Sequence, residues 1–180
     1  MNPKYPHLWR GCAWVLAAGL LAACAHTSAT RPFRRVLVAD FEAMVPSASH
    51  TNVSTSVAEW VTASLVNTPH VSVIDREGLD YLYQQARRRP DPWRVIGRLA
   101  QADYLVVGSV SKVDRNFIIQ ARIFSVRTGK IVPGSSVSRS CDRLEDLYPA
   151  TQALTRVLGL HLQELARRHL QYANPEPSNG

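Results

Sequence analysis

The sequence has few of the residues and motifs that mark catalytic or metal-binding sites. It contains three cysteines in 180 residues, and the histidines at positions 26, 50, 70, 161 and 169 do not have the spacing of metal ligands. No G-x-S-x-G motif is present, and Thr128-Gly129-Lys130 lacks the upstream glycine of a phosphate-binding loop. We therefore expect a protein that is not an enzyme and that has no cofactor and no metal site.

Two pairs of titratable residues have structural explanations that we favour over catalytic ones. Asp40 and Glu42 flank Phe41 just beyond a predicted strand, where acidic side chains commonly face solvent or cap loops. His161 and His169 lie eight residues apart on a predicted helix, a spacing that suits two surface histidines on one face.

Long hydrophobic runs are also absent. The longest apolar stretch near the start, residues 13–21, would rise only about 14 Å as a helix, against about 30 Å for a bilayer core. Lys4 and Arg10 precede it and Leu21-Ala22-Ala23-Cys24 follows it, which is the organisation of an export signal. We predict a lipoprotein signal peptide at 1–23 with lipidation of Cys24. The alternative is ordinary signal-peptidase cleavage after Ala25.

Removal of residues 1–23 takes away two basic residues and no acidic ones, so the remaining chain has a net charge of about +5. Residues 24–35 are predicted to be the lipidated N-terminus and a short tether, 36–172 an α/β domain, and 173–180 a disordered tail. If Cys12 leaves with the predicted signal and Cys24 is acylated, Cys141 has no disulfide partner within the chain. The exposed charge of Arg87-Arg88-Arg89 is interpreted as a solvated turn.

Hydrophobic periodicity predicts strands and helices in alternation through the domain. The expected elements are strand 36–39, loop 45–51, helix 56–67, strand 71–74, a helix after residue 75, helix 93–101, strand 104–110, strand 117–126, a strand from 131 and helix 144–172. The order β-α-β-α-α-β-β-β-α predicts an α/β fold. Its mixed sheet of about five strands has parallel crossovers early, an antiparallel meander at the end and helices packed on it.

Several local signals refine these boundaries. Ser56 and Glu59 have the spacing of a capping box at a helix start, and Asp75 is expected to cap the helix that follows it. In the helix 93–101, Leu99 is expected to point inward with its apolar neighbours. Gly129 is expected to supply the positive φ of a tight hairpin.

Four motifs in order resemble the family of the curli-secretion lipoprotein CsgG, whose relatives include the penicillin-binding-protein activator LpoB and the TolB N-terminal-like domains. The resemblance covers roughly residues 34–165. The motifs are Val36-Leu37-Val38-Ala39-Asp40-Phe41, Ile74-Asp75-Arg76-Glu77-Gly78-Leu79, Ala102-Asp103-Tyr104-Leu105-Val106-Val107-Gly108-Ser109-Val110 and the segment from Ala121 to Ile131.

Two departures from that family bear on function. The family's pore is built from two long membrane hairpins, whereas this chain has only residues 113–116 at one insertion point and about ten residues at the other, so we expect it to lack the pore-forming hairpins. The family's constriction loop has an asparagine followed by an aromatic residue. Asn52 matches the first position and Val53 replaces the second, so we take this pair as a candidate interaction loop.

The resemblance implies an outer-membrane lipoprotein on the periplasmic face that acts as an envelope assembly or secretion accessory factor. The expected partners are the membrane, through the lipid on Cys24, other envelope proteins and further copies in a homo-oligomer, with no nucleic acid. The helix 56–67 is a candidate contact surface, although core packing is the more ordinary use of its Trp60. Activation of a penicillin-binding protein is the alternative function. A third class is ligand binding or enzymatic action on envelope polymers, which would need a pocket with convergent polar groups.

Overall fold

The computed structural model describes residues 33–44 and 51–173. They belong to the second of two compact units of the chain, Arg31–Gly180. The predicted signal peptide 1–23, Cys24, the tether up to residue 32 and the tail from 174 lie outside the described residues.

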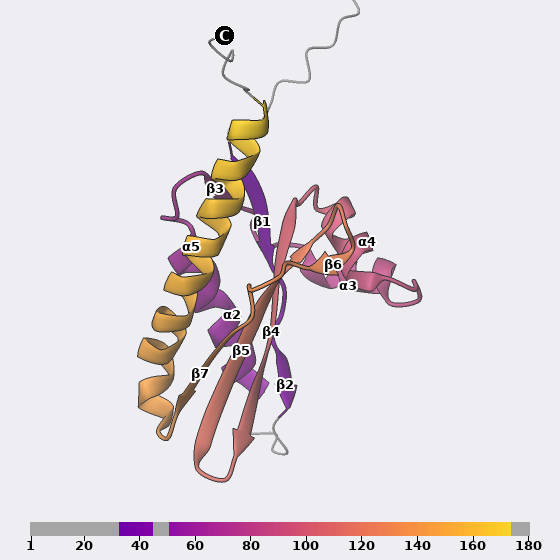
Figure 1. Ribbon diagram of the computed structural model, residues 1–180. Helices are drawn as coiled ribbons and strands as arrows, with labels where there is room; N and C mark the ends of the chain where they lie inside the picture. Colours follow the sequence, from indigo (N-terminus) through magenta and orange to yellow (C-terminus); the bar gives the residue numbers. More distant parts are fainter. Residues whose placement is uncertain (1–32, 45–50, 174–180) are drawn as a thin grey trace, which may run out of the picture. The chain divides into compact units, whose positions relative to one another are not determined.

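A mixed sheet organises the described residues. Its strands are β1 (Arg34–Val38), β2 (Glu42–Met44), β3 (Val71–Val73), β4 (Tyr104–Val113), β5 (Asn116–Ser125), β6 (Lys130–Ile131) and β7 (Val137–Cys141). The order is β3-β1-β4-β5-β6, with β2 also paired to β4 and β7 also paired to β5 (Figure 1). The sheet is therefore five strands wide. β1 and β2 pair one after the other with the same edge of β4, and β6 and β7 pair one after the other with the same edge of β5.

Strand directions follow the predicted topology. β1 runs parallel to β3 and to β4, because helices connect these strands. β5 runs antiparallel to β4 from the Tyr104–Ser125 pair to the Val113–Asn116 pair, and β6 and β7 run antiparallel to β5. The predicted α/β class, the parallel crossovers and the final meander are confirmed.

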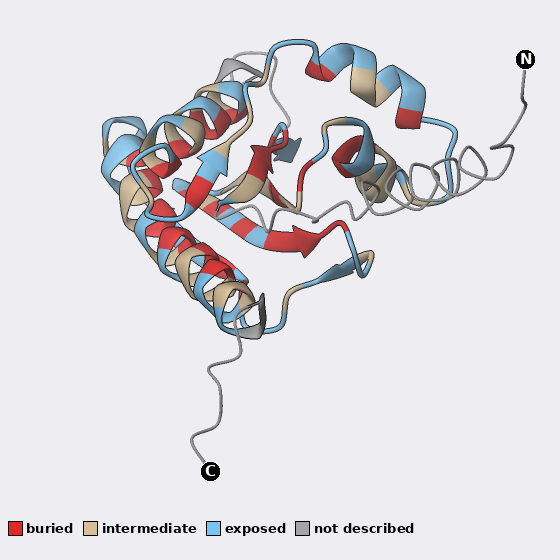
Figure 2. Ribbon diagram, turned by 90° about the horizontal axis from the view of Figure 1, so that it is seen from above, coloured by how far each residue is buried: buried red, intermediate tan, exposed pale blue. Residues whose placement is uncertain are grey.

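Helices cover the two faces of the sheet unequally. On one face, α2 (Thr51–Leu65) and the long α5 (Leu147–Ala173) pack side by side, and their buried residues turn toward the strands (Figures 1 and 2). On the other face, α3 (Leu79–Ala86) and α4 (Pro92–Leu99) lie over the part of the sheet formed by Leu37, Leu105 and Phe124. The rest of that second face has no helix over it among the described residues.

Buried and less buried residues alternate over positions 117–123 of the predicted strand 117–126, and these buried ones face the main core. Phe117, Ile119, Ala121 and Ile123 are buried against α2 and α5. Phe124 points the other way into the smaller core under α3 and α4, as a period of two requires. Gly129 has φ +69°, which confirms the positive φ expected in its turn.

The predicted start of α2 is wrong. The helix begins at Thr51 instead of after Ser56, so Ser56 lies inside the helix and cannot form a capping box with Glu59. Val53 and Val57 are one helical turn apart and both pack against the main core. This tertiary packing outweighs the weak helix propensity of residues 51–55.

Two other local predictions also fail. Asp75 does not cap α3, because that helix starts at Leu79 after Gly78, whose φ is +78°. The Asp75 carboxylate instead accepts a hydrogen bond from the backbone N–H of Glu77 at 3.1 Å, which forms a local turn. Leu99, expected to point inward, has 52% of its surface exposed, because α4 turns Ile96 and Gly97 toward the sheet and Leu99 away from it.

The short strands β2 and β7 were not predicted. All three residues of β2 are exposed, and in β7 only Val137 is buried. A strand with one solvated face and few apolar residues has little hydrophobic alternation to reveal it. Both are held instead by backbone pairing to the long hairpin of β4 and β5.

Candidate functional site

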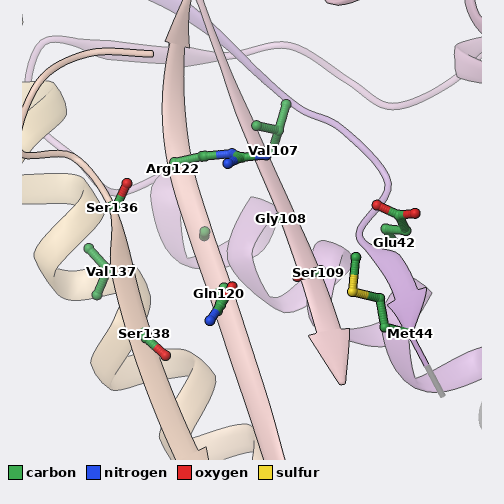
Figure 3. Close-up of a pocket in the computed structure, with 11 residues that line it drawn as sticks. Glu42, Met44, Val107, Gly108, Ser109, Gln120, Arg122, Ser136, Val137 and Ser138 are labelled. Atoms are coloured by element: carbon green, nitrogen blue, oxygen red, sulfur yellow. The ribbon is translucent and has the colours of Figure 1, made fainter. Parts of the chain in front are cut away.

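The uncovered part of the sheet carries a cavity of about 410 Å³. Its floor comes from β4 and β5, and β2 and β7 form its two sides (Figure 3). The register places Glu42 beside Ser109 and Ser109 beside Gln120, so these side chains share one face of the sheet. The pairing of Gln120 with Ser138 continues the same row into β7.

Six polar side chains converge on this cavity without a hydrogen-bond or ion-pair partner within the described part of the chain. Figure 3 shows Arg122 extended across the floor toward Val107, with Ser136 and Ser138 on one side and β2 on the other. Unpaired donors and acceptors of this number are available to a ligand or to water. The six are Glu42, Ser109, Gln120, Arg122, Ser136 and Ser138.

An aromatic wall borders the cavity where α3 and α4 begin to cover the sheet. Tyr83 and Trp93 line a second cavity of about 410 Å³, and it shares Glu42 and Arg122 with the first. The two rings meet edge to face with centroids 6.3 Å apart. The two cavities form one groove, which we call the open-face groove.

Tyr83 is fixed in this wall by its hydroxyl. The backbone N–H of Asp40 donates a hydrogen bond to the Tyr83 Oη at 2.7 Å. Arg76 pairs with the Asp40 carboxylate and donates to the Val38 carbonyl at 2.9 Å. Burial away from water raises the pKa of Tyr83 to about 12, so the phenol is neutral at physiological pH.

The charges around the open-face groove balance. Arg122 and Arg76 carry positive charge, and Glu42 and Asp40 carry negative charge. Asp40 is neutralised by its ion pair, whereas Glu42 and Arg122 remain separate. The groove therefore offers directional hydrogen bonds without a strong field of either sign.

The described residues contain no group of three or more His, Cys, Asp or Glu side chains placed to hold a metal ion. The thiol of Cys141 is half-buried on β7, and burial raises its pKa, which disfavours the reactive thiolate. What the open-face groove provides chemically is hydrogen bonding and aromatic contact.

The site residues predicted from the sequence are placed as follows. Cys24 lies outside the described residues. Asn52 and Val53 belong to the first turn of α2, not to a loop, and Val53 packs against the main core. Asp40 and Glu42 both line the open-face groove.

Sequence reasoning missed the rest of the open-face groove. Gln120 and Arg122 alternate with buried apolar residues along the predicted strand 117–126, and this period of two is the signal that could have found them. The serines of β7 gave no signal, because the strand that carries them was not recognised.

The helix proposed as a contact surface has an aromatic residue at its border with α5. Trp60 of α2 is half-buried and meets Tyr148 of α5 edge to face, with ring centroids 5.2 Å apart. Tyr148 has 50% of its surface exposed and nearby Leu144 has 55%. Trp60 thus contributes to the core and also supports an exposed apolar patch, formed by Trp60, Leu144 and Tyr148, which we call the α2–α5 patch.

Comparison with known sequences gives a match to one family, described as "Curli production assembly/transport component CsgG". The match covers residues 21–121, more than half of the chain. The chain belongs to the CsgG family. In this CsgG-family chain, the matched range contains the motifs on β1, before α3 and on β4, and it ends inside β5, where the fourth motif begins.

Solved structures with a similar fold include three bacterial proteins. The LpoB C-terminal domain from Salmonella enterica is 19% identical over 72% of this CsgG-family chain and 94% of that one, with a TM-score of 0.49. Lipoprotein GNA1162 from Neisseria meningitidis is 16% identical over 79% and 99%, with a TM-score of 0.46. The PelC dodecamer from Paraburkholderia phytofirmans is 12% identical over 73% and 90%, with a TM-score of 0.47. Family membership therefore rests on the sequence match.

None of the curated protein sequences resembles this CsgG-family chain closely enough to count as a relative. Among the residues that the structure describes, no helix combines the length and the apolar character needed to cross a bilayer.

Proposed function

We propose that the chain is a lipid-anchored accessory protein of the bacterial cell envelope. It is held on the periplasmic face of the outer membrane by a lipid on Cys24 and acts through contacts with other envelope proteins, without catalysis. Membership of a family described as an assembly and transport component is the observation that carries this proposal.

The residues before the domain support the same function. Leu21-Ala22-Ala23-Cys24 follows a short apolar run and a positive segment, which is the pattern of a lipoprotein signal. Ala25 follows the cysteine in place of an aspartate, a choice that resembles outer-membrane sorting. The first described strand begins at Arg34, so a tether of about ten residues separates the domain from its lipid.

The α2–α5 patch is the partner surface that we propose. Exposed aromatic and aliphatic side chains at the border of two helices are typical of protein contact sites. Val53 lies seven residues, or two helical turns, before Trp60 on the same face of α2, and we propose that the pair Asn52 and Val53 extends this contact surface along the helix.

The anchor is tested by the Cys24→Ser variant expressed in bacteria. We expect the wild-type chain to fractionate with the outer membrane and to carry a diacylglyceryl mass on its first residue. We expect the variant to keep its signal peptide and to lack that mass. A wild-type chain that retains residues 1–23, or that is soluble without lipid, contradicts the anchor.

The partner surface is tested by crosslinking in cells, with the captured proteins identified by mass spectrometry. We expect envelope proteins to be captured by the wild type and lost in Tyr148→Ala. Tyr81→Ala is the matched control, because Tyr81 is also exposed but lies on α3, on the other side of the sheet. Capture of a penicillin-binding protein together with faster glycan polymerisation would establish the alternative activator function. Capture of cytosolic proteins alone would overturn both.

A further inference from the structure

We propose that the open-face groove is a binding site for a neutral, polyhydroxylated ligand of the oligosaccharide class. This inference goes beyond the accessory function above, because it concerns a small-molecule site on the opposite face of the sheet from α2 and α5. It rests on the polar composition of the groove, its aromatic wall and its balance of charge.

The hydrogen-bonding groups in the floor match a ligand with many hydroxyls. Serine hydroxyls both donate and accept, the Gln120 amide does the same through separate atoms, Arg122 donates and Glu42 accepts. These groups have no hydrogen-bond partners within the described residues, so ligand hydroxyls can replace bound water without breaking hydrogen bonds inside the protein. A solvated sheet face is also polar, but here the groups surround a cavity of about 410 Å³, within the size range of small-molecule sites.

The aromatic wall supplies the second element of sugar recognition. Tyr83 and Trp93 stand beside the polar floor, and aromatic rings pack against the C–H face of a sugar ring. Tyr83 is held by the Asp40 amide and Trp93 by its edge-to-face contact with Tyr83. The wall is therefore preorganised, which lowers the entropic cost of binding.

The charges distinguish a neutral ligand from an anionic one. Arg122 is opposed by Glu42 across the groove, and Arg76 is neutralised by Asp40. An anion would be attracted by Arg122 and repelled by Glu42. A hydroxyl can instead donate a hydrogen bond to Glu42 and accept one from Arg122. A protein partner is disfavoured because the centre of a protein interface is usually apolar, and the centre here is Ser109, Gln120 and Arg122.

The test titrates the full-length chain in detergent with three tetrasaccharides while tryptophan fluorescence and heat are measured. The N-acetylglucosamine tetramer and cellotetraose are neutral, and tetragalacturonate is anionic. We expect a neutral tetramer to bind with a Kd of about 1 mM or below, with little change when sodium chloride is raised. The fluorescence change is expected to be lost in Trp93→Phe and kept in Trp60→Phe.

Variants locate the site. Arg122→Ala is expected to raise the Kd about tenfold, because it removes hydrogen bonds from a charged donor. Gln120→Ala is expected to raise it severalfold, and Ser109→Leu to abolish binding by filling the cavity. Arg115→Ala is the matched control, because Arg115 is exposed in the turn at the end of the same hairpin, and its Kd should equal that of the wild type. Circular dichroism and thermal melting check that each variant is folded.

The inference is overturned if no neutral tetrasaccharide binds up to about 10 mM. It is overturned equally if tetragalacturonate binds more tightly with a strong salt dependence, or if Arg122→Ala and Gln120→Ala bind as the wild type does. Loss of a crosslinked protein in Arg122→Ala, with no saccharide binding by the wild type, would assign the groove to a protein partner instead. None of these measurements depends on the anchor or on the α2–α5 patch. The saccharide proposal can therefore be contradicted while the proposed accessory function holds, and the reverse is also true.

Discussion

Two glycines lie where the backbone meets another part of the molecule too closely for a side chain. A Cβ on Gly108 of β4 would stand 2.4 Å from the Gln120 carbonyl oxygen and 2.4 Å from the Phe41 ring. A Cβ on Gly97 of α4 would stand 2.2 Å from a methyl group of Val126. Backbone cannot move aside as a side chain can, so the two positions should respond differently to the same substitution.

We predict that Gly108→Ala lowers the free energy of unfolding by about 3 kcal/mol and Gly97→Ala by about 2 kcal/mol, both from overpacking. Adding Val126→Ala should recover about 1 kcal/mol in the Gly97 variant, because it removes the clashing methyl groups. Urea denaturation with a double-mutant cycle measures these values. Strictly additive effects of Gly97→Ala and Val126→Ala would contradict the close approach of α4 to the end of β5.

Tyr83 should make stability depend on pH in the alkaline range. Burial raises its pKa to about 12 from the ordinary value of 10.0. Its contribution to stability is fully present below pH 10 and is lost as the pH rises through 12, because the unfolded chain ionises first. We predict that wild-type stability falls more steeply between pH 10 and pH 12 than that of Tyr83→Phe, measured by urea denaturation across that range. Equal slopes would show that the phenol is not desolvated.

Helix α5 is amphipathic along its length, and its two faces should tolerate mutation very differently. Leu158 is fully buried in the main core, whereas Leu160, two residues later, has 62% of its surface exposed. We predict a loss of about 3 kcal/mol for Leu158→Ala, from lost burial and the cavity left behind. Leu160→Ala should change stability by less than about 0.5 kcal/mol. Comparable losses of stability in the two variants would show that α5 does not present Leu158 to the core and Leu160 to solvent.

Elements with a buried face were predictable from the sequence, and elements with exposed faces were not. β1, β4, β5 and α5 carry continuous or periodic apolar residues, and the sequence predicted all four. β2 has three exposed residues and the start of α2 has poor helix formers, so their local sequence contains little of the information that fixes them. Pairing with β4 fixes β2, and packing on the main core fixes the start of α2. Both are tertiary effects.

The candidate site could be predicted from sequence only in part, for the same reason. Asp40 and Glu42 were noticed because they follow a buried strand, and both line the open-face groove. Arg122 and Ser138 meet because β5 lies between β4 and β7. That neighbourhood could not be known from the sequence, because only a strand opening at Ile131 was predicted there and β7 was not. The lipid attachment at Cys24 and the contact function of Asn52 and Val53 stay predictions.

For the molecule as a whole, both cores share one sheet and should unfold together. Trp60 packs against the core under α2 and α5, and Trp93 packs against the core under α3 and α4. The Trp60→Phe variant keeps Trp93 as a reporter of its core, and the Trp93→Phe variant keeps Trp60. We predict that in each variant the fluorescence transition coincides with the loss of helical circular dichroism. A separate, earlier transition reported by Trp93 would show that α3 and α4 detach as a unit before the sheet melts.

The parallel arrangement of β1 and β4 puts the start of the domain and the tip of the β4–β5 hairpin at opposite ends of the sheet. The chain enters the sheet at Arg34, and the turn at Asp114 and Arg115 lies at the far end of the ten residues of β4, which span about 33 Å. β2 ends beside Ser111, near that far end. The open-face groove lies on this hairpin, on the side of the β1–β4 strand pairs away from Arg34. A lipid anchor ahead of Arg34 and a groove ligand would therefore act on different parts of the domain, so neither attachment needs to displace the other.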